Sequence, residues 1–170
     1  YMIAQAVTGT PGHVNTMAAA VGDFIEAIGI DRMRDGDVYL TNDPWKGTGH
    51  LHDITVTTPV FTDPTDENSL IGFFASTAHV VDVGGRGYGP EAREVYEEGI
   101  RVLPTKLLRE GKRNEDLIEV LMANVRVPEP VLGDLEAQIT ANEVCARSVA
   151  DFLTDTGLDD LEDLSRLLQE

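Results

Sequence analysis

The sequence lacks the features of a secreted, disulfide-linked or membrane-spanning protein. It contains a single cysteine, Cys145, so a disulfide within the chain is excluded. No apolar run approaches the roughly 18 residues that a membrane-spanning helix requires. Because the sequence also shows no signal peptide, we expect a cytoplasmic protein that makes no contact with membranes.

Basic residues are also few, since 13 Lys and Arg stand against 30 Asp and Glu for a formal net charge of -17. A chain of this charge repels a phosphate backbone, so nucleic acid is not an expected partner. The acidic excess serves solubility or, alternatively, attracts a basic protein partner or a cation. With 170 residues, of which 42% are hydrophobic, the chain is long enough for one domain with its own core.

Hydrophobic periodicity predicts both helices and strands in the first half of the chain. Apolar residues recur every three or four positions from about 15 to 28, which predicts a helix. Short strands are expected at 38–40 and 54–61, the second because its apolar residues alternate. The nearly continuous apolar run at 70–83 is typical of a strand that is buried on both faces.

The second half is expected to be mainly helical. Periodic apolar residues predict helices at about 114–124, 133–154 and 158–168. We therefore expect an α+β fold, in which helices pack on a mostly antiparallel sheet and the last two helices form a C-terminal hairpin. Residues 1–130 would hold the sheet and the functional site, and residues 131–170 would form the hairpin as part of the same domain.

Possible metal ligands and acid–base groups are concentrated in residues 36–85. If the strands at 54–61 and 70–83 pair as an antiparallel hairpin with Phe61 opposite Leu70, His79 falls opposite His52 and beside Asp53. The pairing of the two strands is therefore enough to bring His79 close to the segment 50–53. The stretch contains three of the four histidines and several aspartates: His50, His52, His79, Asp37, Asp43, Asp53 and Asp82.

Two imidazoles and one carboxylate are a common ligand set for zinc, manganese or iron. Strand residues two positions apart share a face, so binding through His50 together with Asp53 requires a turn at 49–52. Alternatively, the histidines are polar residues at a strand end, or Asp53 and His79 form a metal-free general-base pair. His13 lies in a turn before the first helix, where a solvated or capping role is the alternative to a functional one.

Several motifs together resemble the hydantoinase B/5-oxoprolinase family, which also includes the large subunits of acetone and acetophenone carboxylases. The resemblance runs from about residue 13 to about residue 150. Its first block is a Gly-Asp pair, an Asn-Asp-Pro turn, a glycine loop and His-x-x-Asp-Ile-Thr, and its second is Ala-His followed by Asp-Val-Gly-Gly. The matching residues include Gly36, Asp37, Asn42, Asp43, Pro44, Gly47, Gly49, His50, Asp53, Ile54, Thr55, Ala78, His79, Asp82, Val83, Gly84, Gly85, Glu98, Gly99, Asn124, Arg126 and Pro128.

The resemblance implies an enzyme subunit of the ATP-dependent hydantoinase or oxoprolinase type, or of a related ketone carboxylase. A small cyclic amide or a ketone-derived compound would be the substrate, and an A-type partner subunit or domain would bind the ATP. His50, Asp53 and His79 would hold a divalent transition metal. Asp43 and Asp82 are the catalytic candidates that would support these ligands.

His52 stands where the family commonly has proline, so the resemblance makes it a bystander. Family members are several times longer, and the sequence begins without an initiator methionine, so we expect an N-terminal fragment or a split subunit. The alternative is a non-catalytic assembly domain, in which a structural metal or none stabilises the hairpin and the C-terminal helices bind a partner.

Overall fold

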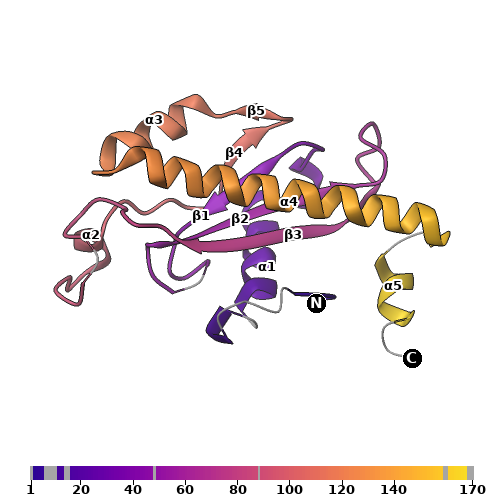
Figure 1. Cartoon of the computed structure of the whole chain (residues 1–170), viewed down its shortest axis with the longest axis horizontal. Coiled ribbons are helices and arrows are strands. Elements are labelled where there is room, and N and C mark those ends of the chain that lie inside the picture. The colour runs from indigo at the N-terminus through magenta and orange to yellow at the C-terminus, as the bar shows by residue number, and fades with distance from the viewer. Residues whose placement is uncertain are drawn as a thin grey trace.

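The computed structural model describes residues 2–5, 11–13, 16–47, 49–87, 89–158 and 161–167. Figure 1 shows a twisted sheet with a long helix lying along one face and a shorter helix standing against the other. All strand pairs are antiparallel, in the order β3-β2-β1-β4-β5. The fold is therefore α+β, as the sequence predicts. The strands are β1 (Val38–Thr41), β2 (Asp53–Phe61), β3 (Leu70–His79), β4 (Thr105–Arg109) and β5 (Lys112–Arg113).

The helices fall close to the predicted segments, with one clear difference at α4. This helix begins at Pro128 rather than at residue 133, because proline is tolerated in the first turn, where its missing N–H would have no helical partner. The helices are α1 (Thr16–Ile28), α2 (Val95–Glu98), α3 (Glu115–Asn124), α4 (Pro128–Thr156) and α5 (Leu161–Leu167), with 3-10 turns η1 (Pro11–His13) and η2 (Ile30–Arg32).

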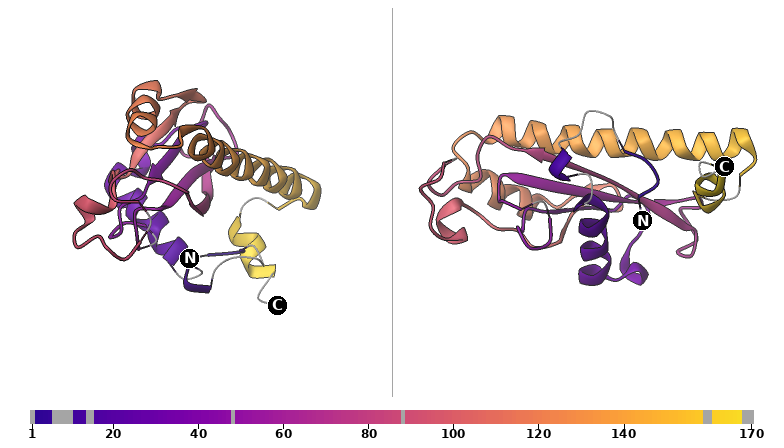
Figure 2. Two further views of the ribbon diagram at one scale, coloured as in Figure 1. Left: turned by 60° about the vertical axis from the view of Figure 1, so that its left-hand side comes forward. Right: turned by 90° about the horizontal axis from the view of Figure 1, so that it is seen from below.

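Two hydrophobic cores lie on opposite faces of the sheet, because alternate residues of a strand point to opposite sides. On one face, Leu40 and Val56 pack with the α3 and α4 residues Leu121 and Leu135. On the other face, Tyr39 packs with Phe24 of α1. Figure 2 shows the sheet between α4 and α1 from two further directions.

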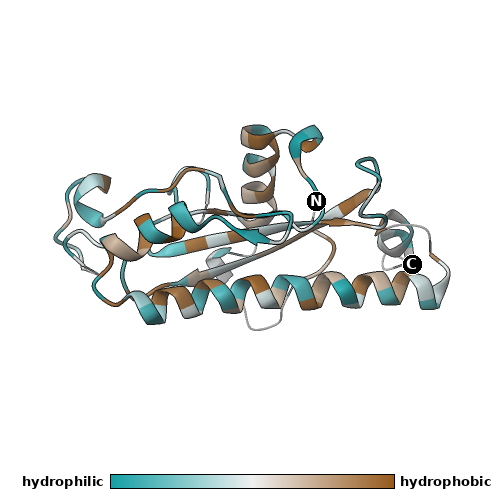
Figure 3. Cartoon of the chain, turned by 90° about the horizontal axis from the view of Figure 1, so that it is seen from above, coloured by the Kyte–Doolittle hydropathy of each residue, from teal (hydrophilic) through white to brown (hydrophobic). Residues whose placement is uncertain are grey.

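The contact between α4 and the sheet is partly polar. The buried Gln138 donates to the carbonyl oxygens of Ile54 and Ser76 at 2.9 and 3.2 Å, so a single amide bridges β2 and β3. One turn later, the buried Asn142 donates to the carbonyl oxygens of Val56 and Phe74. Figure 3 shows the corresponding mixture of hydrophilic and hydrophobic residues along α4. These amides attach α4 to the hairpin that carries the histidines.

The β2–β3 hairpin forms as predicted, but its register differs by one residue. Phe61 pairs with Leu70 as expected, whereas Val60 pairs with Gly72, so Ile71 is an additional residue in β3. Such a bulge shifts all later pairs by one position. As a result, His79 lies opposite Asp53 and not opposite His52.

Strand β3 ends at His79, although the apolar run continues to residue 83. The chain leaves the sheet there, after Val80 N–H donates to the His52 carbonyl oxygen at 2.8 Å. At the far end of the hairpin, Leu161 of α5 packs closely against Gly72 of β3. A Cβ added to Gly72 would lie 2.8 Å from Leu161 Cδ1. Residues 159, 160 and 168 of the predicted last helix lie outside the described residues. Among the described helices, none has the combination of length and hydrophobicity needed to cross a bilayer.

Candidate functional site

The candidate site lies at the open end of the β2–β3 hairpin. Asp53 is the first residue of β2 and His79 is the last residue of β3, so strand pairing places them side by side. His50 is brought to them by a turn in which Asp53 N–H donates to the His50 carbonyl oxygen at 3.2 Å. The turn at 49–52 that metal binding through His50 and Asp53 requires is therefore present.

The Asp53 carboxylate is the centre of the site and faces three histidine rings. Its Oδ1 lies 3.0 Å from His79 Nδ1, and its Oδ2 lies 3.1 Å from His50 Nε2 and 3.2 Å from His13 Nε2. The Asp53 side chain is only 3% exposed, whereas His50 and His79 are 40% and 43% exposed. A buried carboxylate is thus surrounded by imidazoles that a small molecule can reach from solvent.

His13 is a site residue that the sequence indicates only weakly. It belongs to η1, 40 positions before Asp53, and Thr16 at the start of α1 donates its hydroxyl to the His13 carbonyl oxygen at 3.0 Å. No strand pairing connects residue 13 to residue 53, so periodicity cannot predict this approach. The only signal is a histidine next to proline and glycine immediately before a helix.

His52 is part of the cluster, although the resemblance makes it a bystander. Its ring stacks on that of His79 at a centroid distance of 5.4 Å and an interplanar angle of 14°, and it lies 6.2 Å from the His50 ring. The side chain is 2% exposed. Burial lowers the pKa of His52, and the neighbouring His79 lowers it further, while Glu98 acts in the opposite direction. The neutral ring, which is the form that binds metals, is thereby favoured.

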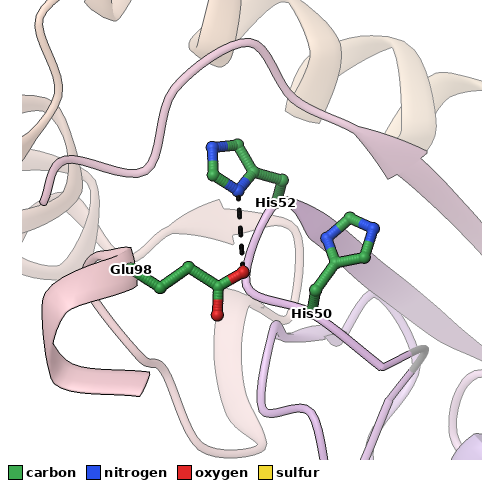
Figure 4. A group of neighbouring side chains, drawn as sticks. All are labelled: His50, His52 and Glu98. Carbon is green, nitrogen blue, oxygen red and sulfur yellow. Dashed lines mark ion pairs between the residues drawn. The ribbon is translucent and has the colours of Figure 1, made fainter. Parts of the chain in front are cut away.

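Glu98 joins the cluster from α2 and appears in the sequence only as part of a motif. Its Oε1 lies 3.9 Å from His52 Nδ1 (Figure 4). The same oxygen accepts a hydrogen bond from Leu51 N–H at 3.3 Å. Asn42 explains this position, since its amide donates to the carbonyl oxygens of both Leu51 and Ile100, each at 2.9 Å. The Asn-Asp-Pro motif therefore holds the segment after α2 against the histidine turn.

The two aspartates predicted as catalytic candidates lie in turns that flank the cluster. Asp43 Oδ1 accepts the Trp45 N–H at 3.1 Å, within the turn that begins the loop toward His50. Neither of the two possible ligand groups among the described residues includes Asp43 or Asp82.

Asp82 binds Arg126 in the segment between α3 and α4. Asp82 Oδ1 accepts the Arg126 Nη1–H at 2.8 Å and the Gly84 N–H at 2.9 Å, and Oδ2 accepts the Arg126 backbone N–H. Burial alone raises the pKa of Asp82, but these hydrogen bonds and the guanidinium charge outweigh it, so the pKa lies below its usual value. Asp82 thus remains a carboxylate that anchors the chain after His79.

Asp37 is fully buried just before β1, and none of its partners among the described residues belongs to the histidine cluster. It accepts hydrogen bonds from the Tyr39 hydroxyl at 2.8 Å and from the Arg34 and Glu110 backbone amides, and its Oδ2 lies 2.5 Å from Lys106 Nζ. Burial, together with the bond to Asp37, raises the pKa of Tyr39, so its hydroxyl stays protonated as a donor.

The donor set fits a divalent transition metal. One ligand atom each from His50, Asp53 and His79 lies within 4.8 Å of the others, and the same holds for His50, His52 and Glu98. Ligands about 2.0–2.2 Å from a tetrahedral ion are about 3.3 Å apart, close to the separations around Asp53. The Nδ1 atom of His50 is buried and accepts or donates no hydrogen bond among the described residues, as expected of a nitrogen available for coordination. Without a metal, the same geometry provides a carboxylate–histidine pair for proton transfer.

Comparison with known proteins matches the chain to one family model, and the similar proteins fit the description of that family. The family model described as hydantoinase B/oxoprolinase matches residues 1–170. The chain is 34% identical over 152 residues to the beta chain of the caprolactamase of Pseudomonas jessenii, which covers 88% of this chain and 25% of that protein. It is 33% identical to the B component of a putative D-/L-hydantoinase of Pseudomonas sp. (strain NS671), covering 81% and 23%, and 32% identical to the 5-oxoprolinase of Dictyostelium discoideum, covering 88% and 12%.

Two solved structures have the same fold. The crystal structure of the ATP-dependent caprolactamase from Pseudomonas jessenii superposes with a TM-score of 0.82 at 32% identity, covering 93% of this chain and 27% of that chain. The nucleotide-free acetone carboxylase gives a TM-score of 0.74 at 24% identity, covering 90% and 20%, which is a likeness of fold alone. The chain thus spans about a quarter or less of the length of the curated relatives that it matches.

Proposed function

The chain belongs to the hydantoinase B/oxoprolinase family, and from this we propose that it is the metal-bearing part of a B-type subunit of an ATP-dependent cyclic amide hydrolase. The observation that carries the proposal is the buried Asp53 carboxylate with three imidazole nitrogens within 3.2 Å of its oxygens. A small cyclic amide is the substrate class, because the relatives above 30% identity include a caprolactamase, a hydantoinase and an oxoprolinase. A ketone-derived substrate is less well supported, since the likeness to acetone carboxylase concerns only the fold.

We propose that His50, Asp53 and His79 hold zinc, manganese or iron. A metal bound there supplies Lewis acidity toward an amide carbonyl or a water molecule. The carboxylate lies beside the nitrogens that would bind the ion with it, since one oxygen faces His79 Nδ1 and the other faces His50 Nε2. The half-exposed edges of His50 and His79 are the groups that substrate would reach first.

The two flanking aspartates act by positioning in this proposal. Asp43 orders the turn that leads to His50 through its bond to Trp45 N–H, and Asp82 anchors the chain that leaves His79 through Arg126. ATP would be bound by an A-type partner subunit. This part of the proposal rests on relatives described as the beta chain of a caprolactamase and as an ATP-dependent enzyme.

The proposal is tested by the metal content of the purified protein. Zinc, manganese and iron are measured by plasma mass spectrometry in the wild type, His50→Ala and His79→Ala, and we expect the metal content per chain to fall in both variants. All four histidines lie at the open end of the β2–β3 hairpin, so none of them can serve as a control variant. The control is therefore Asp63→Asn, which changes an exposed carboxylate beyond the opposite end of β2. A wild-type protein without metal, also when extended to the length of its relatives, would overturn the proposal.

An assembly role is the second candidate, and one observation favours it. Helix α4 exposes Val144 and Phe152, apolar side chains that a partner surface could cover. A metal whose removal unfolds the protein, with no binding of a competing small ligand such as hydroxamate, would favour this structural role over catalysis.

A further inference from the structure

A second group of possible ligands lies directly beside the first and shares one residue with it. Ligand atoms of His50, His52 and Glu98 are all within 4.8 Å of one another. The group draws on the turn before β2 and on the last residue of α2, which Figure 4 shows facing each other. The Asp53-centred set does not use Glu98 or His52.

The His50 ring lies between two carboxylates. Its Nε2 is 3.1 Å from Asp53 Oδ2. In Figure 4 one ring nitrogen of His50 faces the side of His52 and Glu98 and the other faces away. The other ring nitrogen, Nδ1, is buried and makes no hydrogen bond among the described residues. The His50 ring can therefore supply one ligand atom to each group, Nε2 to the group that contains Asp53 and Nδ1 to the group that contains Glu98.

The separation of Glu98 from His52 also suits a shared ion. At 3.9 Å, Glu98 Oε1 and His52 Nδ1 are too far apart for a hydrogen bond. Two ligands on one tetrahedral ion are about 3.3 Å apart, so a shift of roughly half an ångström brings this pair into position. The backbone supports this, because Glu98 Oε1 is held by Leu51 N–H and the Leu51 carbonyl by Asn42.

We propose that Glu98, His52 and Nδ1 of His50 form a second divalent-cation position next to the one centred on Asp53. The inference rests on the proposed function, since the first position is the metal site of that proposal. Occupation of both positions through one imidazole requires the His50 ring to bind as the imidazolate, so its remaining N–H proton passes to solvent when the second cation binds. The Asp53 and Glu98 carboxylates and this ring then balance most of the charge of two dications, so two cations can be bound side by side at this end of the hairpin.

The substitution Glu98→Gln tests the second position without removing its structural contact. Glutamine keeps the side-chain oxygen that accepts the Leu51 N–H and has the same size, but it loses the charge that a cation needs. The matched control is Glu94→Gln, which removes the same charge from an exposed residue just before α2. Asp53→Asn weakens the first position in the same conservative way.

The experiment is a titration of the metal-free purified protein with Zn²⁺ alone, followed by calorimetry and by plasma mass spectrometry after gel filtration. We expect two zinc ions per chain in the wild type and in Glu94→Gln, and one in Glu98→Gln and in Asp53→Asn. Thermal unfolding in the presence of a chelator verifies that each variant is folded.

The outcomes separate the two proposals. One zinc per wild-type chain that is retained in Glu98→Gln and lost in Asp53→Asn overturns the second position and leaves the first intact. One zinc that is lost in Glu98→Gln but retained in Asp53→Asn supports the Glu98 position and overturns the Asp53-centred site. No zinc in any chain overturns both.

Discussion

Asp53 and His79 lie directly opposite each other at the ends of β2 and β3, with His79 Nδ1 3.0 Å from Asp53 Oδ1. The bulge at Ile71, at the far end of the same hairpin, sets this register. Pairing without the bulge would place His52 opposite His79 and leave Asp53 one position away. A single additional residue near the hairpin loop thus decides which side chain meets the histidine.

Removing the Asp53 charge should strongly weaken the proposed cation position that is centred on this residue. In Asp53→Asn we expect zinc affinity at this position to fall by more than about 100-fold, because even the outer partners of metal ligands typically contribute 10–100-fold. The measurement is competition with a chelator of known affinity, with Asp63→Asn as the exposed control. An unchanged affinity would show that Asp53 neither binds the metal nor orients the rings that do.

Replacing His13 tests whether the η1 segment belongs to the site. We expect His13→Gln and His13→Ala to weaken zinc binding about 10–100-fold, since His13 Nε2 lies 3.2 Å from the central carboxylate. The same chelator competition measures it. Because His13 is in a short turn, its loss should change the unfolding temperature of the metal-free protein little. If metal affinity stays constant, His13 is a solvated turn residue.

The pair formed by Asp82 and Arg126 should make stability depend on acid pH. The pKa of Asp82 is lowered in the folded state, so its stabilising contribution is present above its unfolded pKa of about 3.9 and is lost as the pH falls through the folded value. Asp82→Asn removes this titration. We expect it to lower the free energy of unfolding by about 1–3 kcal/mol at pH 7 and by progressively less below pH 4.

Urea unfolding at pH 7, 5, 4 and 3, in the presence of a chelator, measures this difference. Asp116→Asn in the first turn of α3 is an exposed control. A difference between Asp82→Asn and the wild type that stays constant down to pH 3 would contradict the assignment of this titration to Asp82.

Gly84 should be far less tolerant of a side chain than Gly87. Both have a positive φ, +82° and +84°, but a Cβ on Gly84 would lie 2.5 Å from the Asn124 carbonyl oxygen, whereas a Cβ on Gly87 meets nothing within 4 Å. Backbone strain is therefore common to both alanine variants. We expect Gly84→Ala to be less stable than Gly87→Ala by about 1–3 kcal/mol, the usual cost of overpacking.

Thermal and urea unfolding of the two variants provide the comparison. Equal losses of stability would mean that the C-terminal end of α3 moves away from Gly84 at little cost in free energy. That result would also contradict close packing of the Asp-Val-Gly-Gly segment against the C-terminal end of α3.

Several features of the fold follow from the sequence because they are local. Apolar spacing placed α1, β2 and α3 to within a residue or two, and the short polar connection at 62–69 made a hairpin the simplest topology. The early start of α4 was not predicted, since Pro128 and Pro130 fit a helix only when they occupy its first turn. The polar attachment of α4 through Gln138 and Asn142 carries no periodic signal either.

The return of His79 to the His50–Asp53 turn can be predicted from the order of the strands, because antiparallel pairing brings the two ends of a hairpin together whatever the register. The approaches of His13 and Glu98 to the site depend on tertiary packing. His13 reaches Asp53 because α1 packs on the face of the sheet beside β2 and β3, and Glu98 reaches His52 because Asn42 ties Leu51 to Ile100. These approaches depend on packing between segments 40 or more residues apart, which repeating patterns along the chain do not encode.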